Sequence, residues 1–351
     1  MSNIYKPWPA NELESVLACP VCGCAKFRLL HEGLVDDVFN VAPGRWTLKS
    51  CFDCKSAYLD PRPAVDYIGK AYANYYTHLS GDSKLEYKKL NVFRQIRRKL
   101  VNGYVRWKFY STALPASALG VLIVLLIPGI RRRIDREYRH LPRPHETARK
   151  LLDVGSGNGA FLKLAKSCGW NVVGVDPDPA AIEASIRNGF TAYQGGVERF
   201  GSAKELFDII TQNHVIEHLH DPPATIKKCF DLLTPGGILW IETPNISSNG
   251  SLKFGKHWRG VETPRHLVLF NEYSLRCMLI KTGFETVKVV KGPSAVKAMF
   301  EASYSITNGE SPYLPKQFTL MQKLSILFYR IKELVSPASR EVITIVAKKA
   351  I

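Results

Sequence analysis

The sequence lacks several features that would mark a secreted or a repeat protein. Its first residues, "MSNIYKPWPANELE", contain no apolar core of the kind that a secretory signal peptide needs, so we infer a reducing, cytosolic environment. It has no internal repeat and no low-complexity tract. Acidic residues are few, 31 against 48 Lys and Arg, which gives a net charge of +17. The 351 residues, 46% of them hydrophobic, suffice for one large domain or two.

The excess positive charge is not spread evenly. Residues 84–150 hold 17 Lys and Arg against 4 Asp and Glu, a net of +13. A local basic block of this kind indicates an anionic partner, such as a membrane surface, a nucleic acid or a phosphorylated substrate.

An uncharged run, "ALPASALGVLIVLLIPGI" at 113–130, lies inside this basic block. Its 18 residues are the lower limit for a membrane span, but two prolines and two glycines leave an unbroken apolar core of only about ten residues. Lys and Arg flank the run on both sides, so the distribution of positive charge does not set an orientation across a membrane. We expect a monotopic or hairpin insertion with basic helices on anionic headgroups; the alternative is a hydrophobic helix packed over the catalytic domain. Nucleic acid is a less favoured partner, because a duplex binder has no use for an apolar run.

From residue 149 onward, short apolar strands alternate with amphipathic helices. This order predicts an α/β fold with a parallel sheet covered on both faces. The stretch 293–340 interrupts the last pair of strands and includes an amphipathic candidate, "KQFTLMQKLSILFYRIKELV".

A glycine-rich turn follows the first of these strands in "LLDVGSGNGAFL" at 151–162. Glycines here let the backbone approach a ligand closely, and the next helix offers its N-terminal N–H groups. Asp176 ends the second strand, where a carboxylate can accept both hydroxyls of a ribose. The spacing also fits a dinucleotide site. However, Asp153 would repel a pyrophosphate and suits the charged amine of a methionine-like group.

Four segments and a closing pair resemble, in their order along the chain, the class I S-adenosylmethionine (SAM)-dependent methyltransferases: "LLDVGSGNGAFL", "VVGVDPDP", "FDIITQNHVIEHLHDP", "LLTPGGILWIETPN" and the pair "ETVKVV" and "EVITIVAKK". The resemblance covers about residues 149–292 and 340–349, and implies a Rossmann-like doubly wound sheet with an antiparallel last strand. A dehydrogenase and an inactive relative remain the alternatives. The SAM-binding residues that it implies are Asp153, Gly155, Gly157, Gly159, Asp176, Pro177, Gly196, Val197, Asn213 and His214.

Methyl transfer requires the acceptor atom to be held in line with the methyl group, and a hydroxyl acceptor must also lose its proton. Candidate groups are Glu217 and His218 in "VIEHLHDP" and His266 in "PRHLVLF", of which His266 is the preferred base. The structural alternatives are that the Glu-His pair pins the adjoining strand, and that His266 is a buried ring bonded to backbone with Arg265 paired to a carboxylate. Related ubiquinone-pathway O-methyltransferases bind a divalent ion with the help of an acid three residues before this pair. His214 stands at that place here, and this departure disfavours a metal-assisted mechanism.

Two cysteine pairs near the N-terminus have the spacing of a structural zinc ribbon. The pairs consist of Cys19, Cys22, Cys51 and Cys54, with Cys24 as a bystander or a substitute ligand. We expect "FRLLHEGL" and "RWTLKSC" between them to form a β-hairpin. Similar ribbons precede many bacterial methyltransferases of this type, and some sugar C-methyltransferases carry an N-terminal zinc site.

We therefore predict three regions: a zinc-ribbon-like element at 1–65, a basic helical region at 66–147 and a SAM-dependent methyltransferase domain at 148–351. The predicted activity is O-methylation of a small-molecule, glycan, lipid or lipid-linked acceptor at the cytosolic membrane face. Sugar C-methylation, RNA methylation and a catalytically silent membrane-docked scaffold are the alternatives.

Overall fold

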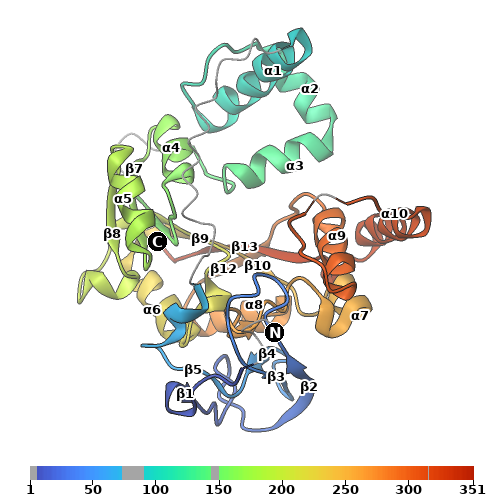
Figure 1. The fold of residues 1–351 in the computed structure, drawn as a ribbon. Helices are drawn as coiled ribbons and strands as arrows, with labels where there is room; N and C mark the ends of the chain where they lie inside the picture. Colours follow the sequence, from blue (N-terminus) through green and yellow to red (C-terminus); the bar gives the residue numbers. More distant parts are fainter. Residues whose placement is uncertain (1–5, 73–90, 144–149, 315) are drawn as a thin grey trace.

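In a computed structural model the protein is described over residues 6–72, 91–143, 150–314 and 316–351. Part of the predicted basic region and its predicted boundary at 147/148 lie outside these ranges. A seven-stranded sheet forms the centre, with helices on both sides (Figure 1). Its strands are β6 (Lys150–Val154), β7 (Asn171–Asp176), β8 (Thr191–Gln194), β9 (Phe207–Asn213), β10 (Leu233–Pro244), β12 (Thr286–Val289) and β13 (Val342–Lys348).

The strand order β12-β13-β10-β9-β6-β7-β8 confirms the predicted doubly wound sheet. Strands β8, β7, β6, β9 and β10 run parallel, whereas β13 is antiparallel to both β10 and β12. The connecting helices are α4 (Ala160–Ser167), α5 (Pro179–Arg187), α6 (Pro222–Leu232) and α8 (Glu272–Thr282).

Local sequence signals set the ends of these helices. Asp178 and Asp221 accept backbone N–H groups at the starts of α5 and α6, and each is followed by a proline at the first helical position. Strand β10 begins at Leu233, ahead of the Pro-Gly-Gly turn at 235–237. The Pro-Gly-Gly turn is a register shift within β10, because its pairing with β9 jumps between Leu233 and Ile238.

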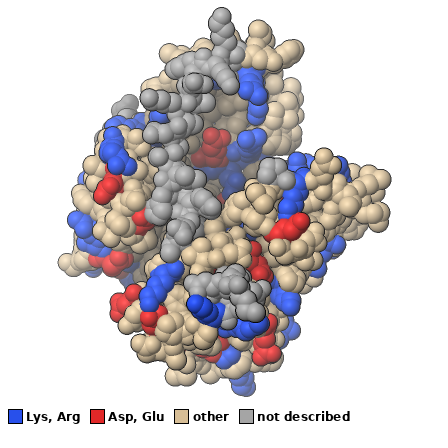
Figure 2. All heavy atoms as spheres, in the orientation of Figure 1, with Lys and Arg blue, Asp and Glu red and all other residues tan. Residues whose placement is uncertain are grey.

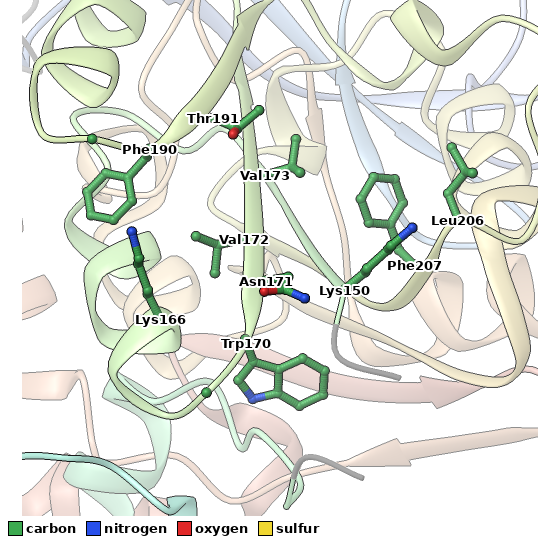
Figure 3. A pocket seen from close by; sticks show the side chains of 12 residues that line it. Lys150, Lys166, Trp170, Asn171, Val172, Val173, Phe190, Thr191, Leu206 and Phe207 are labelled. Carbon is green, nitrogen blue, oxygen red and sulfur yellow. The ribbon is translucent and has the colours of Figure 1, made fainter. Parts of the chain in front are cut away.

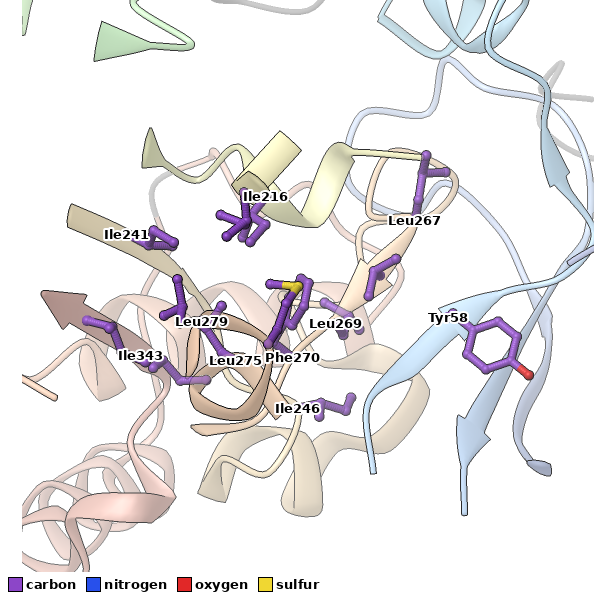
Figure 4. Packing of buried hydrophobic residues seen from close by; sticks show 14 of the residues in the cluster. Tyr58, Ile216, Ile241, Ile246, Leu267, Leu269, Phe270, Leu275, Leu279 and Ile343 are labelled. Atoms are coloured by element: carbon purple, nitrogen blue, oxygen red, sulfur yellow. The ribbon is translucent and has the colours of Figure 1, made fainter. Parts of the chain in front are cut away.

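The N-terminal element, residues 6–72, packs against one end of this core. It contains β1 (Leu13–Glu14), β2 (Phe27–Leu34), β3 (Trp46–Cys51), β4 (Ala57–Leu59), β5 (Arg62–Pro63), η2 (Ala10–Glu12) and η3 (Ile68–Tyr72). Antiparallel pairing of β2 with β3 confirms the predicted hairpin. Strand β4 then pairs with β11 (Val268–Leu269) of the following region, so one sheet contains strands from both. Figure 4 shows Tyr58 of β4 beside the buried cluster around Leu267, Leu269 and Phe270.

The helical lobe, residues 91–143, consists of α1 (Val92–Phe109), α2 (Leu119–Leu126) and α3 (Pro128–Glu137). Gly103 of α1 and Gly120 of α2 allow these two segments to approach closely. A Cβ at either position would clash with the backbone of the opposite segment. Phe109 and Tyr138 stack on each other and belong to a buried cluster that includes Phe161 of α4. None of the described helices is both long enough and apolar enough to cross a bilayer.

The C-terminal lobe contains α7 (Asn249–Phe254), η7 (Gly255–His257), α9 (Val296–Thr307), α10 (Leu320–Val335) and η8 (Pro337–Ser339). Helix α10 contains most of the predicted amphipathic segment. It begins with a capping box, in which Thr319 and Gln322 exchange side-chain-to-backbone hydrogen bonds. In Figure 1 this lobe and the helical lobe extend from the sheet in different directions.

Candidate active site

The glycine turn lies where the parallel strands β6, β7 and β9 end. Gly155, Gly157 and Gly159 have φ of +72°, +52° and +81°, a region that side chains other than glycine rarely adopt. A Cβ at Gly157 would meet nothing within 4 Å, so open space lies beside it. Asp176 Oδ2 accepts the N–H of Gly157 at 2.8 Å and Oδ1 accepts that of Asp178 at 3.0 Å. The turn and the predicted ribose-binding carboxylate therefore meet at one edge of the sheet.

Asp153 lies fully buried below this turn. One carboxylate oxygen accepts a hydrogen bond from Thr211 at 2.8 Å and forms an ion pair with Arg139. The other oxygen is buried with no hydrogen-bond partner among the described residues. Burial raises the pKa of Asp153, and the Arg139 charge opposes that rise. A buried acceptor without a donor is what the ammonium group of SAM requires, so these residues fit the methionine end of that molecule.

Arg139 was not predicted from the sequence. It follows α3 with φ of +46°, and its guanidinium carbon lies 3.6 Å from the centre of the Phe161 ring. Arg136, one turn earlier, donates to Glu242 of β10 at 2.6 Å. The helical lobe thus reaches two acids at the carboxyl edge of the sheet. No local motif marks either arginine, since both belong to a long basic block.

The other predicted SAM-binding residues follow neighbouring strands. Asp176 and Pro177 lie at the end of β7, and Gly196 and Val197 lie at the start of η5 (Val197–Phe200), just after β8. Asn213 ends β9, and the next residue, His214, has φ of +54°. These residues therefore lie at the carboxyl edge of the sheet, while the contacts of each residue with SAM stay a prediction.

The structure brings the three predicted catalytic residues together. Glu217 and His218 lie on η6 (Ile216–His218), and His266 lies just before β11. Each offers one ligand atom, and these atoms lie within 4.8 Å of one another. The His218 and His266 rings meet edge to face with centres 4.8 Å apart.

Backbone carbonyl groups set the tautomer of both imidazoles. His266 Nδ1 lies 2.7 Å from the carbonyl oxygen of Gly260, and His218 Nδ1 lies 3.0 Å from that of Arg265. A carbonyl oxygen only accepts hydrogen bonds, so Nδ1 carries the hydrogen in each ring. Nε2 is then the basic atom of both histidines, available to take a proton or to bind a divalent cation.

Charges around Glu217 keep it ionised although it is buried. Burial alone would raise its pKa, but the hydrogen bond from His214 at 3.0 Å and the nearby histidines lower the pKa to about 2. Thr243 donates to its second oxygen at 3.0 Å. Burial lowers the pKa of His266 to about 4, against the opposing charge of Glu262, so its ring is neutral near pH 7. For His214, the bond to Glu217 outweighs burial and raises the pKa.

The N-terminal element holds this cluster from outside the sheet. Arg265, next to His266, is fully buried and forms an ion pair with Asp36, whose carboxylate also accepts three backbone N–H groups of residues 39–42. The hydroxyl of Tyr72 lies 3.0 Å from His218 Nδ1. The predicted structural role of the Arg265–His266 pair is therefore present, and it leaves His266 Nε2 available. Tyr72 and Asp36 were missed because nothing local in the sequence links them to residues almost 150 or more positions later.

The four predicted metal ligands also meet. The sulfur atoms of Cys19 and Cys54 lie 3.6 Å apart, those of Cys22 and Cys51 lie 3.5 Å apart, and all four lie within 4.8 Å. A tetrahedral zinc ion with Zn–S bonds of about 2.3 Å places its sulfurs about 3.8 Å apart, so this set fits zinc. Cys24 is outside the group and contacts Lys26 instead.

A separate hollow of about 580 Å³ lies at the opposite edge of the sheet (Figure 3). Its lining includes Lys150, Asn171, Thr191 and Phe207, the first residues of β6, β7, β8 and β9. Ligands of doubly wound sheets bind at the carboxyl ends of the strands. This hollow is therefore distinct from the site described above.

Comparison with known proteins identifies the family of the chain. A family profile described as "Methyltransferase domain" matches residues 129–289. A Mycolicibacterium smegmatis protein named "Probable S-adenosylmethionine-dependent methyltransferase" is 31% identical over 188 residues, covering 50% of this chain and 68% of that protein. The chain belongs to the SAM-dependent methyltransferases. This methyltransferase is also 34% identical over 125 residues to the "Ubiquinone biosynthesis O-methyltransferase" of Cereibacter sphaeroides strain ATCC 17029, over 33% of this chain and 49% of that one.

The chain thus spans about half the length of the ubiquinone-pathway relatives that it matches. Among solved structures, a SAM-dependent methyltransferase from Archaeoglobus fulgidus superposes with a TM-score of 0.43 and 22% identity, covering 61% of this chain and 91% of that chain. The strand order described above, rather than this superposition, establishes the fold of the methyltransferase.

Proposed function

We propose that this methyltransferase methylates a hydroxyl group on a glycan, lipid or lipid-linked acceptor at the cytosolic face of a membrane. The observation that carries the proposal is the composition of the helical lobe. Its α2 leaves Leu119, Leu122 and Leu126 exposed, while α1 contains six basic residues and no acidic one. The same lobe reaches Asp153 and Glu242 through Arg139 and Arg136. A membrane-contacting surface would therefore lie directly beside the SAM site.

The residues at the carboxyl edge have separate roles in this proposal. SAM supplies a methyl group on a sulfonium that is already a good leaving group. Asp153 and Arg139 offer one negative and one positive charge to the amino-acid end of SAM, and Asp176 accepts the ribose hydroxyls. Pro177, Gly196 and Val197 border the adenine, and Asn213 and His214 lie under the sulfonium.

His266 is the proposed base, with His218 and Glu217 beside it. A neutral ring whose pKa is about 4 is a weak proton acceptor. It suffices for a hydroxyl group, because the attacking oxygen becomes strongly acidic as its bond to the methyl group forms. The ionised Glu217 then stabilises the imidazolium by its charge. Hydroxyl acceptors are also supported by the ubiquinone-pathway relatives, whose names describe O-methylation.

A structural zinc ion at Cys19, Cys22, Cys51 and Cys54 is part of the proposal. Four thiolate ligands leave no open coordination position, which suits a structural role. The carbonyl oxygen of Cys54 accepts a hydrogen bond from Asn271 at 2.9 Å, and Asn271 caps α8. Zinc would thus support both the N-terminal element and the start of that helix.

The test is transfer of a labelled methyl group from SAM to separated lipid and soluble fractions of a cell extract. The proposal expects label in the lipid or lipid-linked fraction, with ether-type stability to alkali. Label in RNA or in a soluble sugar would instead support the RNA or sugar C-methylation alternatives. A folded, SAM-binding protein that transfers no methyl group to any fraction would support the silent scaffold. Loss of transfer with EDTA, at retained zinc, would indicate a divalent ion at Glu217, His218 and His266.

A further inference from the structure

The outer side of α10 is a continuous apolar stripe. Eight of its side chains are more than half exposed and recur at the one-, three- and four-residue spacing of a single helix face: Leu320, Met321, Leu324, Leu327, Phe328, Ile331, Leu334 and Val335. An amphipathic helix of a globular protein normally turns such a face inward. Here the apolar face points into solvent, and in Figure 2 the lobe that carries α10 is largely uncharged on its outer surface.

The inner side of α10 already has its partners. Ile326 packs with Phe300 and Val296 of α9, and the Tyr329 ring lies 5.0 Å from that of Phe300. The acidic residue of the helix, Glu333, is buried on this side, and burial raises its pKa. The residues of the outer stripe are therefore not the core-facing side of α10, because Ile326, Tyr329 and Glu333 form that side.

Positive charge accompanies the stripe. Lys323, Arg330 and Lys332 are exposed on α10, whereas its single acid faces inward. The helical lobe likewise combines exposed leucines of α2 with six basic residues of α1.

We propose that α10 is a second membrane-contacting element, which lies in the interface of an anionic bilayer while α2 makes the first contact. This inference rests on the proposed function. A second copy of the chain is a poorer occupant, because pairing two α10 stripes would bring the same three exposed cations together without an exposed acid from this helix. Anionic headgroups complement those cations, and the acyl boundary accepts the stripe. Two contacts fix the orientation of the protein on the bilayer, which one contact does not.

The experiment is flotation of the full-length protein with vesicles of phosphatidylcholine, with and without phosphatidylglycerol. Three matched variants each replace two exposed leucines by serine: Leu324→Ser with Leu327→Ser in α10, Leu122→Ser with Leu126→Ser in α2, and Leu17→Ser with Leu29→Ser in the N-terminal element as the control. All six side chains are at least half exposed, so unchanged thermal unfolding is expected and is measured for each variant.

We expect the α10 and α2 variants each to lose about tenfold or more of vesicle partitioning, and the control to keep it. Unchanged partitioning of the α10 variant, with loss in the α2 variant, would overturn this inference and leave the proposed function standing. Absence of vesicle binding by the unmodified protein would overturn both. A dimer of the unmodified protein that the α10 substitutions dissociate, without change in flotation, would identify a second copy as the occupant and contradict the inference.

Discussion

The N-terminal element and the helical lobe both precede the sheet in the chain, and both touch the active site, but they do so differently. The N-terminal element buries Trp46, Leu48 and Tyr58, and it joins the site by strand pairing and the buried ion pair Arg265–Asp36. The helical lobe buries one side against α4 and leaves leucines of α2 in solvent. Its links to the site are Arg136 and Arg139.

The two regions are attached to the site in ways that have different expected effects. The attachment of the N-terminal element stabilises the fold, and that of the helical lobe affects binding. Buried pairing between β4 and β11 makes the N-terminal element part of the core, so its loss is expected to unfold the surroundings of His266. The helical lobe meets the site through two ion pairs with acids at the SAM edge. Its loss is expected to act first on SAM binding and on membrane contact.

The largest effect is expected from Asp36→Ala. This change removes one of the two carboxylates paired with the fully buried Arg265, Glu262 being the other, and leaves three backbone N–H groups without their acceptor. We expect the free energy of unfolding to fall by about 3–5 kcal/mol, measured by denaturant titration. The matched control is Glu14→Ala, which removes a partly exposed partner of Arg62 and is expected to cost less than about 1 kcal/mol. Equal effects of the two substitutions would show that the N-terminal element is not attached through its buried pair.

His266→Gln tests the proposed base beneath that element. We expect kcat to fall by roughly 10²–10⁴-fold with little change in the KM for SAM, because the amide keeps a polar group but cannot take the proton. Tyr72→Phe removes only the hydroxyl near His218 and is expected to lower kcat less. A His266→Gln protein with unimpaired turnover would refute the assignment.

The pH dependence of stability, compared between the unmodified protein and His266→Gln, provides a second measurement. The pKa of His266 is about 4 in the folded protein, below the ordinary value of 6.5, so the unfolded chain binds more protons between these values. Stability conferred by the neutral ring is therefore lost as the pH falls from 6.5 toward 4. We expect the difference in unfolding free energy between the unmodified protein and His266→Gln to shrink by up to about 1.4 kcal/mol per pH unit there. The acid limb of kcat is expected near pH 4.

Arg139→Gln tests the attachment of the helical lobe. Removing the guanidinium leaves burial as the main influence on Asp153 and raises its pKa further. We expect SAM affinity to fall by about tenfold or more and to recover partly at higher pH, where the carboxylate ionises again; calorimetric titration with SAM measures both. Lys163→Gln, on the exposed side of α4, is the control that changes charge alone. A pH-independent loss would contradict a role through Asp153.

The smallest effect is expected from the exposed leucines. Leu122→Ser is expected to change the free energy of unfolding by less than about 0.5 kcal/mol, because its side chain already faces solvent. Leu48→Ser in β3 replaces a fully buried side chain and is expected to cost about 2–5 kcal/mol. Thermal unfolding of the two proteins measures the contrast. Similar losses would mean that α2 is buried in solution.

Sequence patterns predicted the parts of this molecule that depend on local signals. The alternation of strands and helices, the glycine turn and the cysteine spacing each act over a few residues, and the structure places them as expected. Contacts between distant segments had no such signal. Arg139 reaches Asp153 because α3 ends beside the carboxyl edge of the sheet, and Tyr72 reaches His218 because the N-terminal element contacts η6. The sequence also did not predict that the apolar side of α10 is exposed, because an amphipathic pattern does not show which way the apolar face turns.

The antiparallel pair β12 and β13 makes the segment between them, which carries α9, α10 and η8, an exchangeable part. The two strands are neighbours in the sheet, so the segment between them leaves and re-enters at adjacent positions about 5 Å apart. The entropy of closing a loop changes slowly with its length, and long and short connections there differ little in that cost. A change in the length of this segment is therefore expected to leave the pairing of β13 with β10 in place. Such a change would alter the proposed membrane contact of α10 and leave the strand ends of the SAM site unchanged.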